Sequence, residues 1–334
     1  MKAVVYTRFG PPEVLAVEEV AKPTPRADEV LVRVHATTVT SAEAAMRRGE
    51  PLWGRVILGF FRPRKRMRTL GTELAGVIES VGEGVTRFRP GDEVFGFAGF
   101  SIGANAEYMR LRERGSLALK PRNRTFEEAA AAVDGASTAL YFLRDKAAIR
   151  RDQRVLVVGA SGSIGTYAVQ LARYFGAHVT AVCSMGNADL VRSLGAHEVV
   201  DYTREDFTRN GKTYDIIFDT VGKSSFRRCQ GSLTPSGCYL PTTGLFNYVL
   251  STWTRLWGGK RVRTGMSVDK RDALEFLRPL IEADALRVVI DRRYEIDDIV
   301  EAHRYVDSGR KRGNVVVTVA QAPRAPTQVD DRQS

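Results

Sequence analysis

Apolar and polar residues follow two different patterns in the two halves of the chain. Up to about residue 120 the apolar residues form short runs, such as Lys2–Tyr6, 71–81 and Glu93–Phe97, separated by glycine and proline turns. In 30–36 the valines and Ala36 alternate with other residues, which is typical of a strand with one buried face. Short strands at this spacing predict a compact β-barrel-like domain.

From residue 125 onward, strand patterns alternate with helical ones. The predicted strands are Arg154–Val158, His178–Cys183, Glu198–Asp201, 214–220, 237–242 and 314–319. The predicted helices are 126–132, 139–145, 163–175, 188–194, 269–283 and 296–308. This alternation is typical of α/β proteins with a doubly wound parallel sheet.

A glycine turn lies between the strand at Arg154–Val158 and the helix that follows it. A residue without a side chain at Gly162 lets a pyrophosphate approach the backbone, and Gly165 lets the helix lie close to the strand. The N–H groups at the start of the helix attract anions. We therefore predict dinucleotide binding here, with a tight turn that binds nothing as the alternative. The predicted contacts are Gly159, Ala160, Ser161, Gly162, Ser163, Ile164 and Gly165.

Length and composition limit the protein class. A chain of 334 residues suggests about two domains, and 43% hydrophobic residues is ordinary for a globular protein. We find no apolar run long enough to span a bilayer and no signal-peptide core. The three cysteines form no C-x-x-C pair, which suits a reducing cytosol, so we expect a cytoplasmic protein.

The formal net charge of +11 has two interpretations. An arginine-rich soluble surface would attract phosphate-bearing ligands, whereas nucleic-acid binding would require a recognition motif. The sequence contains no such motif, so we favour the first interpretation.

Two stretches, 55–68 and 246–263, mix aromatic and basic residues. Each is compatible with contact to a membrane or an anionic partner. The alternatives are a loop over the active-site cleft for 55–68, and a cleft-lining helix or dimer face for 246–263. We favour these alternatives over membrane contact.

The order of these parts resembles the medium-chain dehydrogenase/reductase family over about residues 1–319, and within it the zinc-independent quinone oxidoreductase branch. The motifs that carry the resemblance, besides the glycine turn, are DEVLVRV at 28–34, GTELAG at 71–76, GDEVFG at 91–96, AVQLA at 168–172 and LGA at 194–196.

The resemblance implies two domains and a homodimer. A GroES-like, β-rich catalytic domain would span 1–124 and be completed by about 288–319. A Rossmann NAD(P)-binding domain would span 125–287, and we expect the tail at 320–334 to be disordered.

The resemblance also implies an enzyme without zinc. Zinc-using members place a cysteine where this chain has Thr40 and a histidine where it has Thr72. Threonine is a poor zinc ligand, and the chain has no cysteine before Cys183 for the family's structural site. We therefore predict no metal site. Reduction of a quinone or an α,β-unsaturated carbonyl needs only hydrogen-bond donors at the carbonyl oxygen, which suits hydride transfer from NADPH.

The cofactor preference is predicted from the end of the strand at His178–Cys183. NAD enzymes usually place a carboxylate there, but this chain has Ser184 and Asn187. Tyr202 matches a family tyrosine near the adenosine. No basic residue stands at 186 or 187 to meet a 2′-phosphate. We favour NADPH over NADH.

The remaining site residues are carried over from the family. The cofactor contacts implied in this way are Thr138, Thr220, Val221, Gly222, Thr243 and Asn314. Thr40 and Glu43 are catalytic candidates, with Thr40 donating a hydrogen bond to the substrate oxygen. The alternative is that both residues cap a helix, and that water supplies the proton.

Two other functions stay open at this point. An enoyl or alkenal reductase is the near alternative. A nucleotide-responsive binding protein, which would use the two basic aromatic stretches, is the alternative from a different class.

Overall fold

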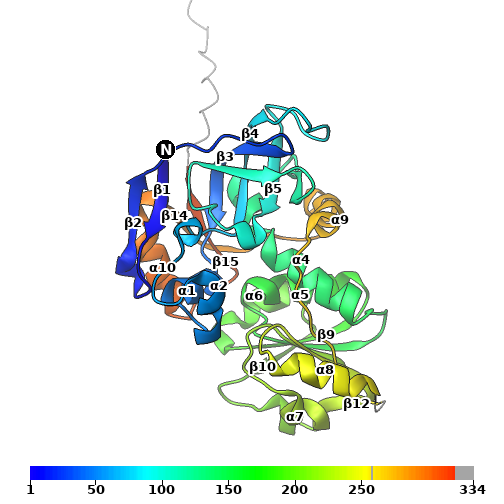
Figure 1. Cartoon of the computed structure of the whole chain (residues 1–334). Helices are drawn as coiled ribbons and strands as arrows, with labels where there is room; N and C mark the ends of the chain where they lie inside the picture. Colours follow the sequence, from blue (N-terminus) through cyan, green and yellow to red (C-terminus); the bar gives the residue numbers. More distant parts are fainter. Residues whose placement is uncertain (257–258, 320–334) are drawn as a thin grey trace, which may run out of the picture.

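Two β-sheets, each built largely from one part of the chain, organise the computed structural model, which describes residues 1–256 and 259–319 (Figure 1). The first is a six-stranded parallel sheet in the order β10-β9-β8-β11-β12-β13. Its strands are β8 (Arg154–Val158), β9 (His178–Cys183), β10 (Glu198–Asp201), β11 (Tyr214–Asp219), β12 (Leu233–Pro241) and β13 (Arg261–Val262).

Both faces of this parallel sheet are buried, as its near-continuous apolar strands require. Val155 and Val157 of β8 face one core, and Leu156 and Val158 face the other. The covering helices are α4 (Asp134–Leu140), α5 (Ser163–Tyr174), α6 (Ala188–Ser193), α7 (Phe226–Cys229), α8 (Phe246–Leu256) and α9 (Arg271–Glu282). The strand order reverses at β8, and ligands of such sheets bind at the carboxyl ends beside that point.

The second sheet has seven strands in the order β14-β15-β3-β4-β5-β7, with β6 paired to β3. Its strands are β3 (Glu29–Thr38), β4 (Glu73–Val81), β5 (Glu93–Phe97), β6 (Tyr108–Arg112), β7 (Ser116–Leu119), β14 (Ile290–Glu295) and β15 (Asn314–Thr318). Beside it lie the strand pair β1 (Lys2–Tyr6) and β2 (Leu15–Glu19), and the helices α1 (Ser41–Arg48), α2 (Arg55–Leu58), α3 (Phe126–Ala131) and α10 (Ile299–Asp307).

The end of the chain returns to the second sheet and also touches the first. β15 pairs with β3 in antiparallel orientation. Just before it, Gly313 forms a bridge to Gly162 and donates a hydrogen bond of 2.8 Å to the carbonyl of Ser161. The predicted α/β fold class, with a β-rich domain and a doubly wound parallel sheet, is therefore confirmed. The exact domain boundaries stay a prediction.

The sequence misjudged β3. The alternation in 30–36 predicts one exposed face, but β3 is buried along nearly its whole length. Its pairing with β4 shifts register between Val34 and Ala36, and α3 packs over the strand beside Ala36. His35 stacks on Phe126 of that helix at 4.4 Å between ring centroids. A helix far along the chain thus covers the face predicted to be open.

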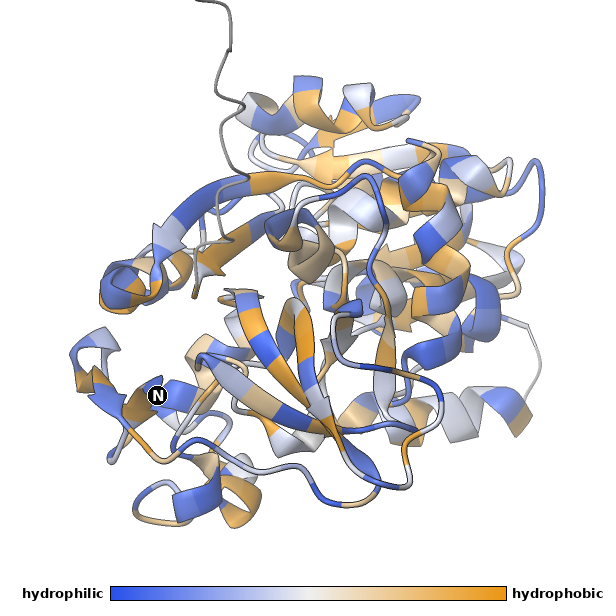
Figure 2. Ribbon diagram, turned by 90° about the horizontal axis from the view of Figure 1, so that it is seen from above, coloured by the Kyte–Doolittle hydropathy of each residue, from blue (hydrophilic) through white to orange (hydrophobic). Residues whose placement is uncertain are grey.

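Several other elements differ from the sequence-based expectation. β2, β6, β7 and β14 were not predicted, because each is short and rich in charged or small residues. β12 begins at Leu233, earlier than the predicted strand at 237–242, and its pairing with β11 is irregular in this first part. Figure 2 shows hydrophobic and hydrophilic segments mixed along the strands, and many connecting loops in the hydrophilic colour.

The tail 320–334 and Trp257 lie outside the described residues. Across 1–256 and 259–319, no helix is both long enough and apolar enough to cross a membrane.

Candidate functional site

The glycine turn lies at the carboxyl end of β8. Gly159 has a φ of +76°, and the amides of Gly159 and Ala160 donate to the carbonyl of Val182 at 3.1 Å each. A Cβ on Gly165 would lie 2.1 Å from the carbonyl oxygen of Gly159, so only glycine lets α5 approach the strand this closely. A Cβ on Gly162 would meet only that same oxygen, at 3.3 Å. The space beside Gly162 is thus left open by the protein, as a phosphate cradle requires.

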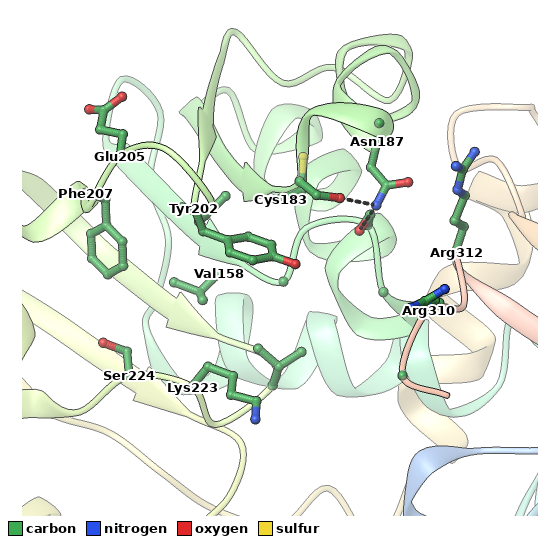
Figure 3. Close-up of a pocket in the computed structure, with 18 of the residues that line it drawn as sticks. Val158, Cys183, Asn187, Tyr202, Glu205, Phe207, Lys223, Ser224, Arg310 and Arg312 are labelled. Carbon is green, nitrogen blue, oxygen red and sulfur yellow. Dashed lines mark hydrogen bonds between the residues drawn. The ribbon is translucent and has the colours of Figure 1, made fainter. Parts of the chain in front are cut away.

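A cavity of about 880 Å³ lies in front of this turn. Figure 3 shows Tyr202 extending across it, with Lys223 and Ser224 on one side and Asn187, Arg310 and Arg312 on another. The predicted residues that line the cavity are Gly159, Ser161, Gly162, Ser184, Asn187, Tyr202 and Val221.

The end of β9 is organised by Asn187. Its side-chain amide donates to the hydroxyl of Ser161 at 3.1 Å and to the hydroxyl of Ser184 at 3.2 Å. Tyr202 also lines the cavity, and 62% of this residue is exposed. Residues 184–187 themselves carry no carboxylate side chain. The Asp201 carboxylate approaches them from the end of β10, where hydrogen bonds from Thr203 and from the Met185 backbone lower the pKa of Asp201. Glu205 and Asp206 line the cavity further along. Asp206 is engaged by the amide and hydroxyl of Thr208.

A basic segment, 310–312, here called the strap, lines one side of the cavity, and we did not predict it from the sequence. Arg310, Lys311 and Arg312 line the cavity from the segment between α10 and β15. The ammonium of Lys311 turns toward the carbonyl of Gly313 at 2.8 Å, and burial lowers its pKa to about 8. Figure 3 shows Arg310 and Arg312 on the same side of the cavity as Asn187. The signal in the sequence was the basic run 310–312, which lies more than 120 residues after β9 along the chain.

Asp219 shapes the turn after β11, and the sequence reasoning missed this residue as well. Its buried carboxylate accepts hydrogen bonds from Gly222 N and Ser224 N at 2.8 Å each, and from the Tyr239 hydroxyl at 3.0 Å. This network fixes the turn that carries Val221 into the cavity wall. In the same turn Gly222 has a φ of +67°.

The other predicted cofactor residues lie behind or beside the cavity wall. Thr220 donates its hydroxyl to the carbonyl of Val158 at 2.8 Å, and Ser163 donates to Oδ1 of Asn314 at 2.6 Å. Thr243 is exposed after β12, and a Cβ on Gly222 would lie 2.3 Å from its hydroxyl. The residues outside the lining set are Thr138, Ala160, Ser163, Ile164, Gly165, Thr220, Gly222, Thr243 and Asn314.

Thr40 and Glu43 form the capping box of α1. The Thr40 hydroxyl accepts from Glu43 N at 3.1 Å, and Glu43 Oε2 accepts from Thr40 N at 2.9 Å. Glu43 Oε1 accepts from Thr72 N at 2.7 Å. One carboxyl group therefore links Thr40 and Thr72, the two positions where zinc-using members have a cysteine and a histidine. Burial raises the pKa of Glu43 to about 7. The helix-capping interpretation is confirmed, and the catalytic roles stay a prediction.

Thr138 belongs to a buried polar cluster between the two sheets. Lys270 Nζ lies 3.0 Å from the Thr138 hydroxyl and 2.6 Å from Asp134 Oδ1. Glu73 accepts hydrogen bonds from the Thr38 hydroxyl and the Asp134 amide. Burial, with help from the Asp134 charge, raises the pKa of Glu73. Burial also opposes ionisation of Asp134, but the Lys270 ammonium and the hydrogen bonds outweigh it and lower the pKa of Asp134.

The last feature of the site is the distribution of side chains that could bind a metal ion. Among the residues that the structure describes, no group of three or more histidine, cysteine, aspartate or glutamate side chains is placed to hold a metal ion.

Comparison with known proteins agrees with this architecture. Family models match at residues 26–122 (alcohol dehydrogenase GroES-like domain) and 194–317 (zinc-binding dehydrogenase). The mitochondrial NAD(P)H oxidoreductase RTN4IP1 of Mus musculus is 30% identical, covering 87% of this chain and 82% of the relative. The 2-methylene-furan-3-one reductase of Solanum lycopersicum is 30% identical, covering 95% and 79%. The structure of the quinone oxidoreductase from Coxiella burnetii has a TM-score of 0.88 at 27% identity, covering 96% and 99%.

Proposed function

The chain belongs to the medium-chain dehydrogenase/reductase family, in its quinone oxidoreductase-like branch, and from that premise we propose that it is an NADPH-dependent reductase of quinones or α,β-unsaturated carbonyls. The observation that carries this proposal is the cavity at the glycine turn, where Gly162 leaves room for a pyrophosphate at the start of α5. Names of relatives include both a quinone oxidoreductase and an enone reductase, so both substrate classes are retained.

The residues present fit a dinucleotide. Gly159, Ser161 and Gly162 would hold the pyrophosphate against the start of α5, and Tyr202 would lie beside the adenosine. When bound, the cofactor supplies the hydride for the reaction. The chain's own residues would bind and orient it: Asp219 fixes the turn that carries Val221 into the cavity wall, and Asn314 accepts a hydrogen bond from Ser163 at the start of α5.

The preference for NADPH over NADH rests on charge. Residues 184–187 offer hydroxyl and amide groups and carry no carboxylate side chain of their own, which suits a 2′-phosphate. Arg310 and Arg312 face this corner from the strap and take the place of the missing basic residue at 186 or 187. Guanidinium groups bind phosphate with paired hydrogen bonds.

Thr40 is the proposed hydrogen-bond donor to the substrate oxygen. Its hydroxyl oxygen accepts from the Glu43 amide, which leaves the hydroxyl proton free to donate. Glu43 would act as a positioning residue, because it ties the Thr40 and Thr72 segments together. Negative charge that develops on a quinone or enone oxygen needs such a donor, and no metal is required.

The function is tested by following NADPH oxidation with a benzoquinone, a naphthoquinone, an enone, an alkenal and a saturated ketone. We expect turnover with the conjugated acceptors and little with the saturated ketone. Tight NADPH binding without turnover of any acceptor would contradict the proposal and favour a nucleotide-responsive binding protein.

Zinc independence and assembly are proposed separately. Metal analysis of the active protein should find no stoichiometric zinc, and activity should survive chelation; zinc-dependent activity would contradict this.

We also propose a cytoplasmic homodimer formed along β13, which is the last strand in the order of the parallel sheet in the described residues. Light scattering should give twice the chain mass.

A further inference from the structure

The segment 51–68, here called the arm, carries an unusual outward face. Its apolar side chains occur in pairs four residues apart, and all six are between 48% and 88% exposed. They are Leu52, Trp53, Val56, Ile57, Phe60 and Phe61. None of them lines the cavity described above. The expectation that apolar residues of 55–68 cover the active-site cleft stays a prediction.

The arm is a folded element with an inner side. Leu58 and Met67 are buried in the core beside β1, and Gly54 is buried as well. Gly59 has a φ of +126°, and a Cβ there would lie 2.0 Å from the carbonyl oxygen of Arg62. The Arg64 amide closes the turn on the Leu58 carbonyl at 2.8 Å. The outward apolar pairs are thus held in place opposite an anchored side.

The charges of the arm have one sign. It contains six basic residues, and the nearest acidic residues along the chain are Glu50 and Glu73. The basic residues are Arg55, Arg62, Arg64, Lys65, Arg66 and Arg68. In the described residues none of them forms an ion pair, and Arg62, Lys65 and Arg66 are exposed directly after the Phe60–Phe61 pair.

We propose that the arm docks the protein on an anionic lipid bilayer. Exposed apolar and aromatic side chains flanked by lysine and arginine suit the boundary between headgroups and acyl chains. The phenylalanine pair would enter this boundary, and the cations after it would meet lipid phosphates. This proposal goes beyond the reductase function, because the arm lies outside the cofactor cavity.

Charge and chemistry favour lipid over two other occupants. A second copy docked arm to arm would place the two cationic segments against each other, because a two-fold contact pairs identical patches. A nucleic acid would use the cations, but Leu52, Val56 and Ile57 offer it neither base stacking nor hydrogen bonds. An anionic bilayer satisfies both the apolar and the cationic parts.

The test is flotation of the full-length protein with vesicles of phosphatidylcholine alone or mixed with phosphatidylglycerol. The wild-type protein should float with the mixed vesicles, and binding should fall as salt rises. The double variant Phe60→Ser/Phe61→Ser should lower the bound fraction about tenfold. The triple variant Arg62→Gln/Lys65→Gln/Arg66→Gln should bind weakly and lose the preference for anionic vesicles.

A charge-matched control is available elsewhere on the surface. Arg89→Gln/Arg114→Gln/Arg227→Gln removes three exposed basic residues outside the arm and should float like the wild type. All variants should keep wild-type thermal stability and NADPH oxidation with a water-soluble acceptor, so failure of docking is separable from failure of the reductase function.

Several outcomes would overturn the docking proposal. These are absence of flotation at low salt, equal flotation of the arm variants and the control, binding to a single-stranded oligonucleotide in place of vesicles, or a change of oligomeric mass in the phenylalanine variant without vesicle binding.

Discussion

The ammonium group of Lys270 lies 2.6 Å from the Asp134 carboxylate and ties α4 to the start of α9. Lys270 is buried, whereas the Asp134 side chain is 32% exposed. Lys270 also lies 4.6 Å from the centroid of the Phe97 ring. This pair joins the two sheets at the polar cluster that includes Glu73 and Thr138.

Removing the cation alone should destabilise the fold. In the Lys270→Met variant Asp134 would face Glu73 without a counter-charge, so we expect the free energy of unfolding to fall by about 2 kcal/mol. This is less than for a fully buried ion pair, because the Asp134 side chain is partly exposed. The double variant Lys270→Met/Asp134→Leu should recover most of that loss. Urea unfolding measures the stability of both variants. A Lys270→Met protein as stable as the wild type would contradict this expectation.

Gly162 and Gly165 form a matched pair of tests for the glycine turn. Gly165→Ala places a Cβ 2.1 Å from a carbonyl oxygen, so we expect a stability loss of about 1–3 kcal/mol. Gly162→Ala should change stability little, yet its methyl group would occupy the space for the pyrophosphate and raise the Kd for NADPH at least about tenfold. Thermal unfolding and cofactor titration separate the two effects. Equal behaviour of both variants would contradict the assignment.

Arg310 and Arg312 should determine the cofactor preference. Arg310→Gln/Arg312→Gln should lower kcat/KM for NADPH by about ten- to a hundredfold, because two phosphate-binding guanidinium groups are lost. The value for NADH should change much less. Lys223→Gln, on another side of the cavity, serves as the control and should not change the ratio between the cofactors. A wild-type preference for NADH would refute the NADPH proposal directly.

Variants of Thr40 distinguish a helix-capping role from a catalytic role. Thr40→Val removes the N-cap oxygen and should cost about 1 kcal/mol of stability. If its hydroxyl also donates to the substrate, kcat should fall about ten- to a hundredfold. Thr40→Ser keeps both the cap and the donor and should behave like the wild type. Unchanged turnover of a folded Thr40→Val protein would leave Thr40 with the capping role alone.

His303 should make the fold sensitive to acid. It is fully buried beside Arg47 and Arg48, and neither ring nitrogen has a hydrogen-bond partner among the described residues. Burial, with these cations, lowers the pKa of His303 from 6.5 to about 3. The neutral ring therefore favours the folded state above pH 6.5, and this contribution is lost as the pH falls from 6.5 toward 3, where only the unfolded chain takes up the proton.

The measurement is the free energy of unfolding at neutral and at mildly acidic pH. Between about pH 8 and 5.5 the wild type should lose about 1 kcal/mol more than His303→Leu. The surface variant His178→Gln should follow the wild type. A His303→Leu protein that is as acid-sensitive as the wild type would show that other groups dominate.

The sequence by itself determined the parallel sheet and its glycine turn. β8, β9 and β10 have the predicted bounds, because their short valine-rich runs are typical of strands in a parallel sheet covered by helices. Gly162 and Gly165 were predictable for a related reason. Their function depends on local backbone geometry, which their immediate neighbours specify.

Only the tertiary structure decided which distant residues complete the site. Arg310 and Arg312 reach the cavity because Gly313 pairs with Gly162 across the two sheets, and no local pattern specifies that contact. The Lys270–Asp134 pair and the burial of His303 likewise depend on how helices pack over long sequence separations. Local periodicity specifies secondary structure, but charge pairing and exposure depend on long-range packing, which is why the arm's outward apolar face became visible only in the folded protein.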